Sequence, residues 1–401
     1  MKVICNIGRL VGILPEGILR KEGAGMATTG VLENAWLGIE NGRIAGYGPM
    51  PTCPSCHSGQ IEESVDARGG MVMPGFCDSH THIVYAGSRD GEFLDKINGL
   101  SYEEIAARGG GILNSASLLH ATDEDSLFEQ SMARVNEMME KGTVAMEIKS
   151  GYGLNPEDEL KMLRVIRRIK NSIPAAVRST FLMAHAVGRG YSHDEYVQEV
   201  IDTLSSAAPL ADFVDVFCDE GFFTPEDTER ILRATSLPAK IHANELAVSG
   251  GVQVGVKCGA LSVDHLERCT DAEIEALKGS RTIPTMLPGS SFFLGLPYGR
   301  ARDFVDAGLP LALASDYNPG SSPSGDMRFV MALGCIKMKL TPVEAFNAVT
   351  INGACAMGIS VDYGSITAGK RAALILTHPG WDLTKIVYQY NTPFINRSFC
   401  F

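Results

Sequence analysis

Eight short apolar runs, separated by helix-length amphipathic segments, constrain the fold of this chain more than any other feature. Runs that are apolar throughout suit parallel strands that are buried on both faces. Eight strands alternating with helices over about 280 residues are the pattern and the size of a (β/α)8 TIM barrel, an α/β fold. We therefore predict such a barrel. Its strands are expected in residues 71–79, 143–150, 178–184, 213–218, 239–243, 260–266, 282–287 and 311–315.

Three of the intervening segments begin with the same signature of a helix start. Asn155 and Thr224 are each followed by proline and two or more acidic residues, and Thr341 is followed by proline and, two residues after it, by Glu344. An Asn or Thr side chain at this position accepts a hydrogen bond from the first helical turn, and proline fits the first helical residue. We predict that a helix begins directly after each of the three residues.

The two ends of the chain have a different pattern, with short alternating stretches typical of β-strands. Asn41-Gly42 is a dipeptide that favours a two-residue hairpin turn. The pattern predicts that residues 1–70 and 358–401 form the two parts of one small composite β-sandwich domain. Residues 71–357 are then the barrel.

Composition excludes several classes of partner. The chain has 401 residues, of which 45% are hydrophobic, so it can bury a large core. Its formal net charge of −12 argues against a surface that follows nucleic-acid phosphates. The chain has no uninterrupted apolar run of about 18 residues, and Arg9 interrupts the apolar start, so we predict neither a membrane span nor a signal peptide. We expect a cytoplasmic protein without nucleic-acid or membrane partners.

The ten cysteines are scattered along the chain, which predicts reduced thiols rather than a disulfide framework. The stretch Cys53 to His57 matches the C-x-x-C-H pattern of haem attachment, and its cysteines are also half of a zinc site by spacing. Haem attachment would need export, and the zinc reading lacks a second pair of ligands nearby. We therefore predict a Pro-rich surface turn at this stretch.

Polar side chains gather at the predicted carboxyl ends of the strands, where barrel enzymes have their active sites. Five of the nine histidines lie there. His80 and His82 are two residues apart, so a strand projects both to one face. Together with His242 and Asp316 they supply three nitrogens and one carboxylate and leave a position for water. This donor set is expected for a catalytic zinc or iron ion.

Two further residues at the same end of the barrel are candidates for proton transfer. Glu245 lies three residues after His242 and is predicted to be a base or proton shuttle beside metal-bound water. His265 is predicted to hydrogen-bond the same water or the oxyanion that develops during the reaction. The sequence thus predicts a hydrolytic metal site.

Several segments resemble known enzymes. "PGFCDSHTH" resembles the first-strand signature of the amidohydrolase superfamily, and "SGYGL", "KIHANE" and "DYNPGSS" together resemble the imidazolonepropionases of histidine degradation. The resemblance extends from about residue 70 to 355. Ser79 and Asn244 depart from the family pattern, which usually has proline and an acidic residue at these positions.

The resemblance implies hydrolysis of the cyclic amide C–N bond of 4-imidazolone-5-propanoate, which yields N-formimidoyl-L-glutamate. It implies one zinc or iron ion per chain on His80, His82, His242 and Asp316, and a homodimer. A guanidinium can bind the propionate carboxylate through two hydrogen bonds, which suits Arg89. The implied substrate contacts are Arg89, Tyr152, His185, Glu245, Asn318, Gly320 and Ser321.

Three other functions stay open on the sequence. A cytosine- or guanine-type aminohydrolase uses the same ligand arrangement, although Arg89 and Tyr152 favour a carboxylate-bearing ring. A two-metal cyclic amidase needs a bridging carbamylated lysine, which in related barrels follows the fourth strand. Lys149 follows the second strand, so we assign it a structural or electrostatic role. A non-catalytic scaffold has no reason to retain four ligands and Glu245.

Overall fold

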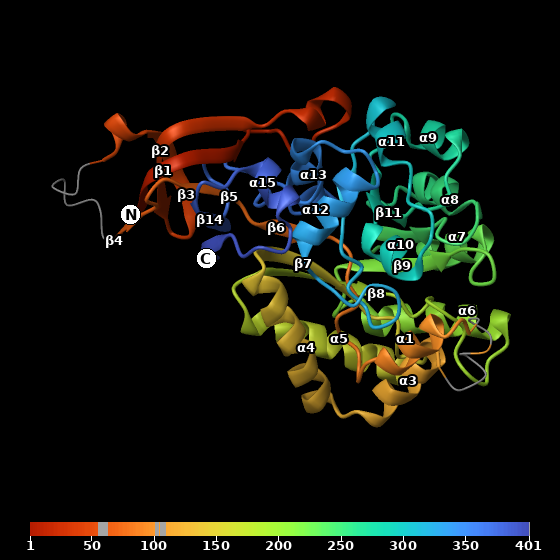
Figure 1. Ribbon diagram of the computed structural model, residues 1–401. Helices are drawn as coiled ribbons and strands as arrows, with labels where there is room; N and C mark the ends of the chain where they lie inside the picture. Colours follow the sequence, from red (N-terminus) through yellow and green to blue (C-terminus); the bar gives the residue numbers. More distant parts are fainter. Residues whose placement is uncertain (55–62, 101–103, 105–109, 401) are drawn as a thin grey trace.

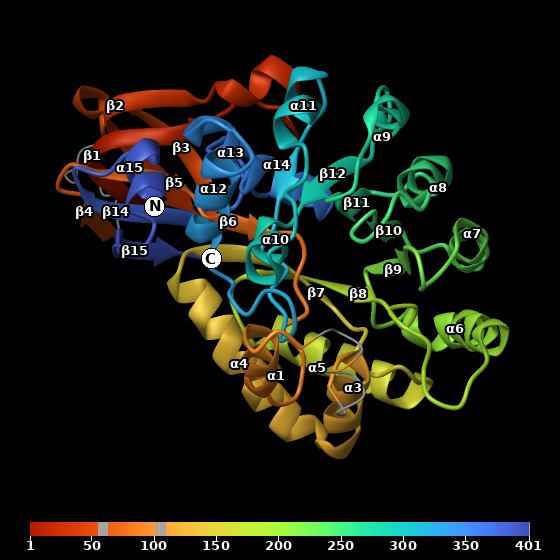
Figure 2. The same ribbon diagram turned by 45° about the vertical axis from the view of Figure 1, so that its right-hand side comes forward.

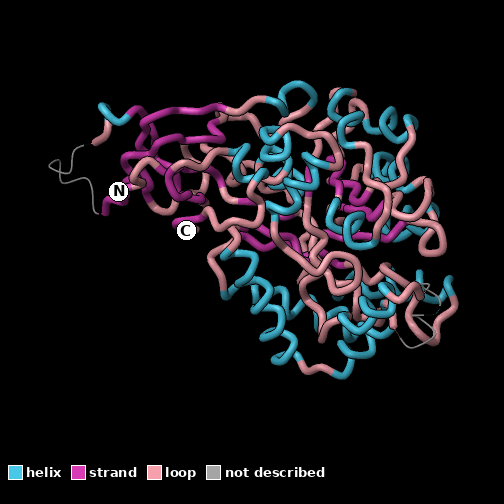
Figure 3. The backbone as a smooth tube through the Cα atoms, in the orientation of Figure 1, coloured by secondary structure: helices cyan, strands magenta, loops and turns pink. Residues whose placement is uncertain are grey.

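The computed structural model describes residues 1–54, 63–100, 104 and 110–400, and its strands form two separate sheets (Figure 3). The larger sheet has eight strands that pair in parallel in the order of the sequence, which confirms the predicted (β/α)8 barrel. These strands are β6 (Phe76–Asp78), β7 (Thr143–Lys149), β8 (Ala176–Phe181), β9 (Phe213–Cys218), β10 (Ala239–Ala243), β11 (Ser262–His265), β12 (Ile283–Met286) and β13 (Ala312–Leu313).

The barrel closes between its first and last strands, just beyond the ends of β6 and β13. Thr81 and Tyr317 form a parallel bridge there. The amide of Asp316 donates to the carbonyl of His80 at 3.0 Å, and the amide of His82 donates to the carbonyl of Tyr317 at 2.9 Å. The hydrogen bonds that close the barrel therefore also bring three of the predicted ligands together.

Helices α5 to α9 lie around the outside of the barrel strands (Figure 2). Asn155, Thr224 and Thr341 each accept a backbone hydrogen bond from the first turn of the following helix, which confirms the three predicted helix starts. Within the described residues the helices are α1 (Asp90–Ile97), α3 (Ile112–Ala121), α4 (Glu124–Glu140), α5 (Pro156–Ser172), α6 (His193–Ala207), α7 (Pro225–Arg233), α8 (Gly251–Cys258), α9 (Asp271–Leu277), α10 (Pro288–Leu294), α11 (Ala301–Asp306), α12 (Met327–Ile336), α13 (Pro342–Ala348), α14 (Ile351–Ala356) and α15 (Leu383–Tyr388), together with the 3-10 turns η1 (Gly23–Ala27) and η2 (Met50–Thr52).

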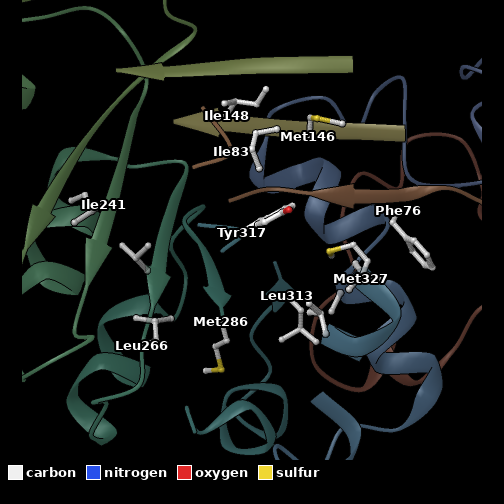
Figure 4. Close-up of a cluster of buried hydrophobic side chains, with 14 of the residues drawn as sticks. Phe76, Ile83, Met146, Ile148, Ile241, Leu266, Met286, Leu313, Tyr317 and Met327 are labelled. Carbon is white, nitrogen blue, oxygen red and sulfur yellow. The ribbon is translucent and has the colours of Figure 1, made fainter. Parts of the chain in front are cut away.

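The main hydrophobic core lies in the layer between the barrel strands and the surrounding helices. Figure 4 shows part of it, with Phe76 from the first barrel strand, Met146 from the second and Leu313 from the last. These three side chains are fully buried. Each aliphatic or aromatic side chain of this kind stabilises the fold by about 1.5–3 kcal/mol through burial.

The smaller sheet combines strands from both ends of the chain, as predicted, on one side of the barrel (Figure 1). Its strands run in the order β15-β14-β5-β1-β2-β3, with β4 paired to β1, and enclose a second hydrophobic core. Because β5 (Gly70–Pro74) pairs in this sheet, we propose that the first division lies at residue 75 rather than at the expected residue 70, and the second at residue 357. The strands are β1 (Lys2–Ile13), β2 (Gly30–Glu40), β3 (Arg43–Pro49), β4 (Glu63–Asp66), β5 (Gly70–Pro74), β14 (Leu374–Pro379) and β15 (Ile395–Phe399).

Two local features of this sheet bear on the sequence predictions. Asn41 and Gly42 both have positive φ, 50° and 73°, and join β2 to β3, which confirms the predicted hairpin turn. The run at 71–79, predicted as one barrel strand, is instead divided between β5 of the small sheet and β6 of the barrel. Gly75 lies between them: its amide donates to the carbonyl of Ala373 at 3.0 Å, whereas the amide of Phe76 donates to the carbonyl of Gly142 at 3.0 Å. A Cβ at Gly75 would lie 2.3 Å from Cγ1 of Val144.

Among the described residues, no disulfide joins the cysteines, and none of the helices is both long and apolar enough to cross a membrane. Cys53 lies directly after η2. Residues 55–57 of the predicted Pro-rich turn lie outside the described residues.

Candidate active site

A cavity of about 850 Å³ opens at the carboxyl ends of the barrel strands. Its wall contains every site residue predicted from the sequence except His80, whose side chain is fully buried. The predicted residues that line it are His82, Arg89, Tyr152, His185, His242, Glu245, His265, Asp316, Asn318, Gly320 and Ser321.

The four predicted metal ligands converge at the base of this cavity. Nε2 of His82 lies 3.2 Å from Nε2 of His80 and 3.3 Å from Nε2 of His242. Oδ1 of Asp316 lies 3.6 Å from Nε2 of His80 and 3.7 Å from Nε2 of His82. All four side chains are at least 97% buried, so three imidazoles and one carboxylate face one another away from bulk water.

Carboxylates behind two of the imidazoles orient their ring nitrogens. Nδ1 of His80 is hydrogen-bonded to Oδ2 of Asp264 at 2.7 Å, and Nδ1 of His242 lies 3.0 Å from Oδ2 of Asp215. A carboxylate at Nδ1 favours the tautomer with the proton on Nδ1, so that Nε2 presents its lone pair to the cavity. Asp264 and Asp215 are therefore expected to orient His80 and His242 for binding at Nε2.

Burial keeps these imidazoles neutral. It lowers the pKa of His80 and of His82 well below the usual range, and it lowers the pKa of His242 to about 3. Neutral rings that point lone pairs at one another across little more than 3 Å repel unless a cation lies between them. The residues present therefore fit a zinc or iron ion.

A buried charge network lies behind the ligands. Nζ of Lys149 donates to Glu147 and to Asp215, both at 2.7 Å, and lies 3.5 Å from Asp264. Nζ of Lys240 donates to the same Glu147 and, at 3.0 Å, to the carbonyl of Ser79. Two lysines thus face three carboxylates, which leaves an excess of negative charge beneath the imidazoles. Carbamylation of Lys149 would add another negative charge there, so this geometry supports the electrostatic role predicted for it.

Replacing Lys149 with Met is expected to lower the free energy of unfolding by about 3–5 kcal/mol, since it leaves buried carboxylates uncompensated. Urea unfolding measures this change. Lys141→Met is the control, because Lys141 pairs with Glu137 in a partly exposed bridge whose loss costs less than about 1 kcal/mol. Equal unfolding midpoints for the two variants would contradict the role assigned to Lys149.

Asp316 is held in a strained conformation by the loop that follows β13. Its φ is 51°, in the left-handed region that non-glycine residues rarely adopt. Its Oδ2 accepts hydrogen bonds from the hydroxyls of Ser290 and Ser321, which leaves Oδ1 directed to the histidines. Strain of this kind is typical of functional sites, where surrounding contacts fix the residue.

Glu245 and His265, the two residues predicted to transfer protons, lie close together beside the predicted ligands. Oε2 of Glu245 lies 3.7 Å from Nε2 of His265, and Oε2 of Glu267 lies 3.5 Å from Nδ1 of the same ring. Burial raises the pKa of Glu245 to about 7, despite the opposing effect of His265. Burial alone lowers the pKa of His265, but Glu245 and Glu267 raise it well above the usual range. The pair therefore combines a carboxylate that exchanges protons near neutral pH with a cationic donor.

Positive charge lies on the wall formed by α1. Arg89 precedes α1, and Lys96 lies seven residues later, two turns along, so both are on one side of the helix. Nε and Nη2 of Arg89 donate to Glu92 at 2.9 and 2.6 Å. Nζ of Lys96 donates to the carbonyl of Gly320 at 3.0 Å. Two cations and one carboxylate leave a net positive charge at this wall.

The loop after β13 forms the neighbouring part of the wall. Oδ1 of Asn318 accepts hydrogen bonds from the amides of Gly320 and Ser321, both at 2.8 Å, which fixes the turn. Gly320 leaves space for the guanidinium of Arg89, because a Cβ here would lie 2.3 Å from Nη1. The glycine is thus needed for the close approach of Arg89.

Aromatic rings form the remaining wall. The ring of His185 stacks on that of His82 with centroids 5.2 Å apart, and the ring of Tyr152 lies 6.0 Å from that of His82. Phe217 and Phe222, which the sequence analysis did not select, pack on each other at 4.2 Å and also line the cavity. A flat ring fits between such walls.

Comparison with known sequences decides the family. A curated imidazolonepropionase of Flavobacterium johnsoniae is 50% identical, and the match covers 98% of this chain and 97% of that protein. The chain belongs to the imidazolonepropionase family. Family members of Christiangramia forsetii and Geobacillus kaustophilus are 49% and 41% identical, over 99% and 91% of this chain and 98% and 88% of those proteins. The model of the broader amidohydrolase family matches residues 254–399.

Solved structures share the fold of this imidazolonepropionase-family chain at low identity. An adenosine deaminase of Xanthomonas campestris with bound zinc has a TM-score of 0.73 and 17% identity, with 100% of this chain and 91% of that chain covered. A guanine deaminase of C. acetobutylicum has a TM-score of 0.71 and 16% identity, with 99% and 98% covered. The fold is therefore common to enzymes that act on different rings.

Proposed function

We propose that this chain hydrolyses the cyclic amide C–N bond of 4-imidazolone-5-propanoate and releases N-formimidoyl-L-glutamate. One observation carries the proposal: a single cavity combines converging neutral imidazoles, the Glu245–His265 pair and a cationic wall. Membership of the imidazolonepropionase family supports the same reaction.

His80, His82, His242 and Asp316 would hold the ion. Bound there, zinc or iron supplies Lewis-acid chemistry, which lowers the pKa of water and polarises a carbonyl. Imidazole and carboxylate ligands suit both metals. We further propose a homodimer in the cytoplasm, on the family resemblance.

Glu245 carries the proton in the proposed reaction. Its carboxylate takes a proton from the attacking water as the water oxygen bonds to the ring carbonyl carbon. His265 donates a hydrogen bond to the oxyanion that forms. Glu245 then gives its proton to the ring nitrogen as the C–N bond breaks, which opens the ring and returns the carboxylate.

Arg89 and Lys96 provide the positive charge for the propionate carboxylate. Replacing Arg89 with Met is expected to raise KM by about 10–100-fold, since a hydrogen bond to a charged group contributes about 1.5–3 kcal/mol. The carboxylate is remote from the breaking bond, so kcat is expected to change much less. Steady-state kinetics measure both constants.

Arg9→Met is the matched control for Arg89→Met. Arg9 pairs with Glu33 on the exposed surface of the small sheet, with 42% of its side chain accessible. This variant is expected to keep the wild-type KM. An unchanged KM in Arg89→Met would remove Arg89 from the carboxylate site.

Substrate choice tests the proposed function against its alternatives. The purified protein is given freshly prepared imidazolone propionate, cytosine and guanine, and the loss of ring absorbance is followed with identification of the product. We expect turnover of imidazolone propionate alone, with N-formimidoylglutamate as the product. Ammonia release from a nucleobase would indicate an aminohydrolase, and bound metal without turnover of any ring would indicate a scaffold.

A further inference from the structure

Two loops that present side chains of the proposed site are each held by one buried carboxylate that lies outside the loop. Glu159 on α5 holds the loop that presents Tyr152, and Asp219 after β9 holds the loop that presents Glu245. Their side chains play no part in the proposed proton transfers or substrate contacts. The two carboxylates instead bind backbone amides of these loops.

Glu159 is fully buried and collects the backbone amides of the loop after β7. Its carboxylate accepts hydrogen bonds from the amides of Gly151, Gly153 and Leu154 at distances of 2.7 to 3.2 Å. Tyr152 lies within this run, and its ring lines the cavity. A charged acceptor strengthens each of these hydrogen bonds, so the carboxylate fixes the backbone on both sides of Tyr152.

The same loop also orients His185. The carbonyl of Gly151 lies 2.9 Å from Nδ1 of His185, while the amide of Gly151 donates to Glu159. Gly151 has a φ of 113°, which favours glycine, and a Cβ there would lie 2.7 Å from Nδ1 of His185. Because Nδ1 is occupied by this contact, Nε2 of the ring is the nitrogen left for the cavity. Through Gly151, Glu159 thus positions both Tyr152 and His185 on the cavity wall.

Asp219 holds the loop after β10 in the same way, by accepting hydrogen bonds from its backbone amides. Its Oδ2 accepts hydrogen bonds from the amides of Glu245 and Leu246 at 2.7 and 2.8 Å, and its Oδ1 accepts one from the amide of Ala247 at 3.1 Å. The Asp219 side chain is 97% buried. Because three consecutive amides donate to one carboxylate, the backbone at Glu245 has little freedom. The Cα from which the Glu245 side chain extends is therefore fixed in position.

We infer that Glu159 and Asp219 are separate positioning residues, Glu159 for substrate binding by Tyr152 and His185, and Asp219 for proton transfer by Glu245. The assignment rests on the proposed function, since it takes Glu245 as the proton carrier. A purely structural role would give both carboxylates the same effect, namely lower stability with unchanged chemistry. The positioning role instead separates them in kinetics.

Four variants and one control test the separation. Glu159→Ala is expected to raise KM by about 10-fold or more with a smaller change in kcat, since binding contacts made equally in ground and transition states affect KM. Asp219→Ala is expected to lower kcat by about 10-fold or more with a smaller change in KM, since it displaces a group that acts in the transition state. Glu159→Gln and Asp219→Asn keep one acceptor oxygen. Each is therefore expected to change the same kinetic constant as the Ala variant at its position, but by a smaller factor.

Glu273→Ala is the matched control. Glu273 is also a buried carboxylate, and it accepts hydrogen bonds from the Thr270 amide, the Thr270 hydroxyl and Gln253 at the start of α9, outside the cavity lining. Its loss is expected to leave both constants unchanged. Variants of Glu159 and Asp219 that match this control, or that change the same constant, would overturn the inference.

Amide hydrogen exchange separates failure of the inference from failure of the proposed function. Asp219→Asn is expected to speed exchange at residues 245–247, and Glu159→Gln at residues 151, 153 and 154, each without affecting the other loop. If the wild-type protein does not turn over imidazolone propionate, the proposed function fails while this comparison stands. If one variant speeds exchange in both loops, or speeds it in neither loop, the two carboxylates do not hold their loops separately.

Discussion

Glu245→Gln is expected to lower kcat by about 10²–10⁴-fold, the usual contribution of a positioned general base. Gln keeps the size and the polarity of the side chain but accepts no proton at neutral pH. The amide is not among the four proposed ligands, so about one metal ion per chain is expected to remain. Steady-state kinetics and elemental analysis of the same sample measure both quantities.

Glu267→Gln is the control for Glu245→Gln, because Glu267 lies on the opposite nitrogen of His265 and does not line the cavity. It is expected to affect kcat far less. Turnover at the wild-type rate in Glu245→Gln would remove Glu245 from the chemistry. Loss of metal in this variant would instead assign it to the ligand set.

His242→Ala is expected to remove both the metal and measurable turnover. The substitution takes away one of three converging imidazoles and leaves Asp215, which also binds Lys149, without the ring beside it. Free energies of metal binding are large compared with ordinary contacts, about 10–16 kcal/mol for structural zinc sites, so one missing ligand has a large effect. Elemental analysis and the absorbance assay measure the two outcomes.

His185→Ala is the control that separates a ligand from a neighbouring imidazole. Its ring stacks on His82 and lines the same cavity, but its Nδ1 contacts the Gly151 carbonyl. We expect this variant to keep its metal and to show a raised KM. The account of the site would be contradicted if His185→Ala lost the metal and His242→Ala retained it.

Much of the fold was predictable because strand–helix alternation and helix caps are local signals. The eight apolar runs correspond in order to the barrel strands, and histidines at the strand ends meet because parallel strands share one carboxyl edge. The residue at which the first barrel strand begins was harder to predict from the sequence. The division at Gly75 depends on backbone partners far along the chain, Ala373 for Gly75 and Gly142 for Phe76.

The buried groups behind the ligands were harder to find from the sequence. Asp215, Lys240 and Asp264 stand inside apolar strands, where charged residues are rare unless paired, and this is a usable signal. Their partners, however, come from different strands, so the sequence alone does not show which carboxylate lies behind which histidine.

Asn244 shows how structure explains a departure from the family pattern. Its φ is 58°, in the left-handed region that Asn tolerates better than most residues. Its amide nitrogen donates to the carbonyl of Arg268 at 2.9 Å. The side chain therefore stabilises the turn between His242 and Glu245, and it is not needed for the proposed chemistry.

Metal titration of the metal-free protein tests whether this chain needs a metal ion to hydrolyse imidazolone propionate. Zinc or ferrous iron is added in steps while the loss of imidazolone propionate absorbance is followed. We predict no turnover before addition, and a rise that stops at one ion per chain. Full turnover in the metal-free protein, or one bound ion without hydrolysis of imidazolone propionate, would contradict a metal-dependent imidazolone hydrolase at this site.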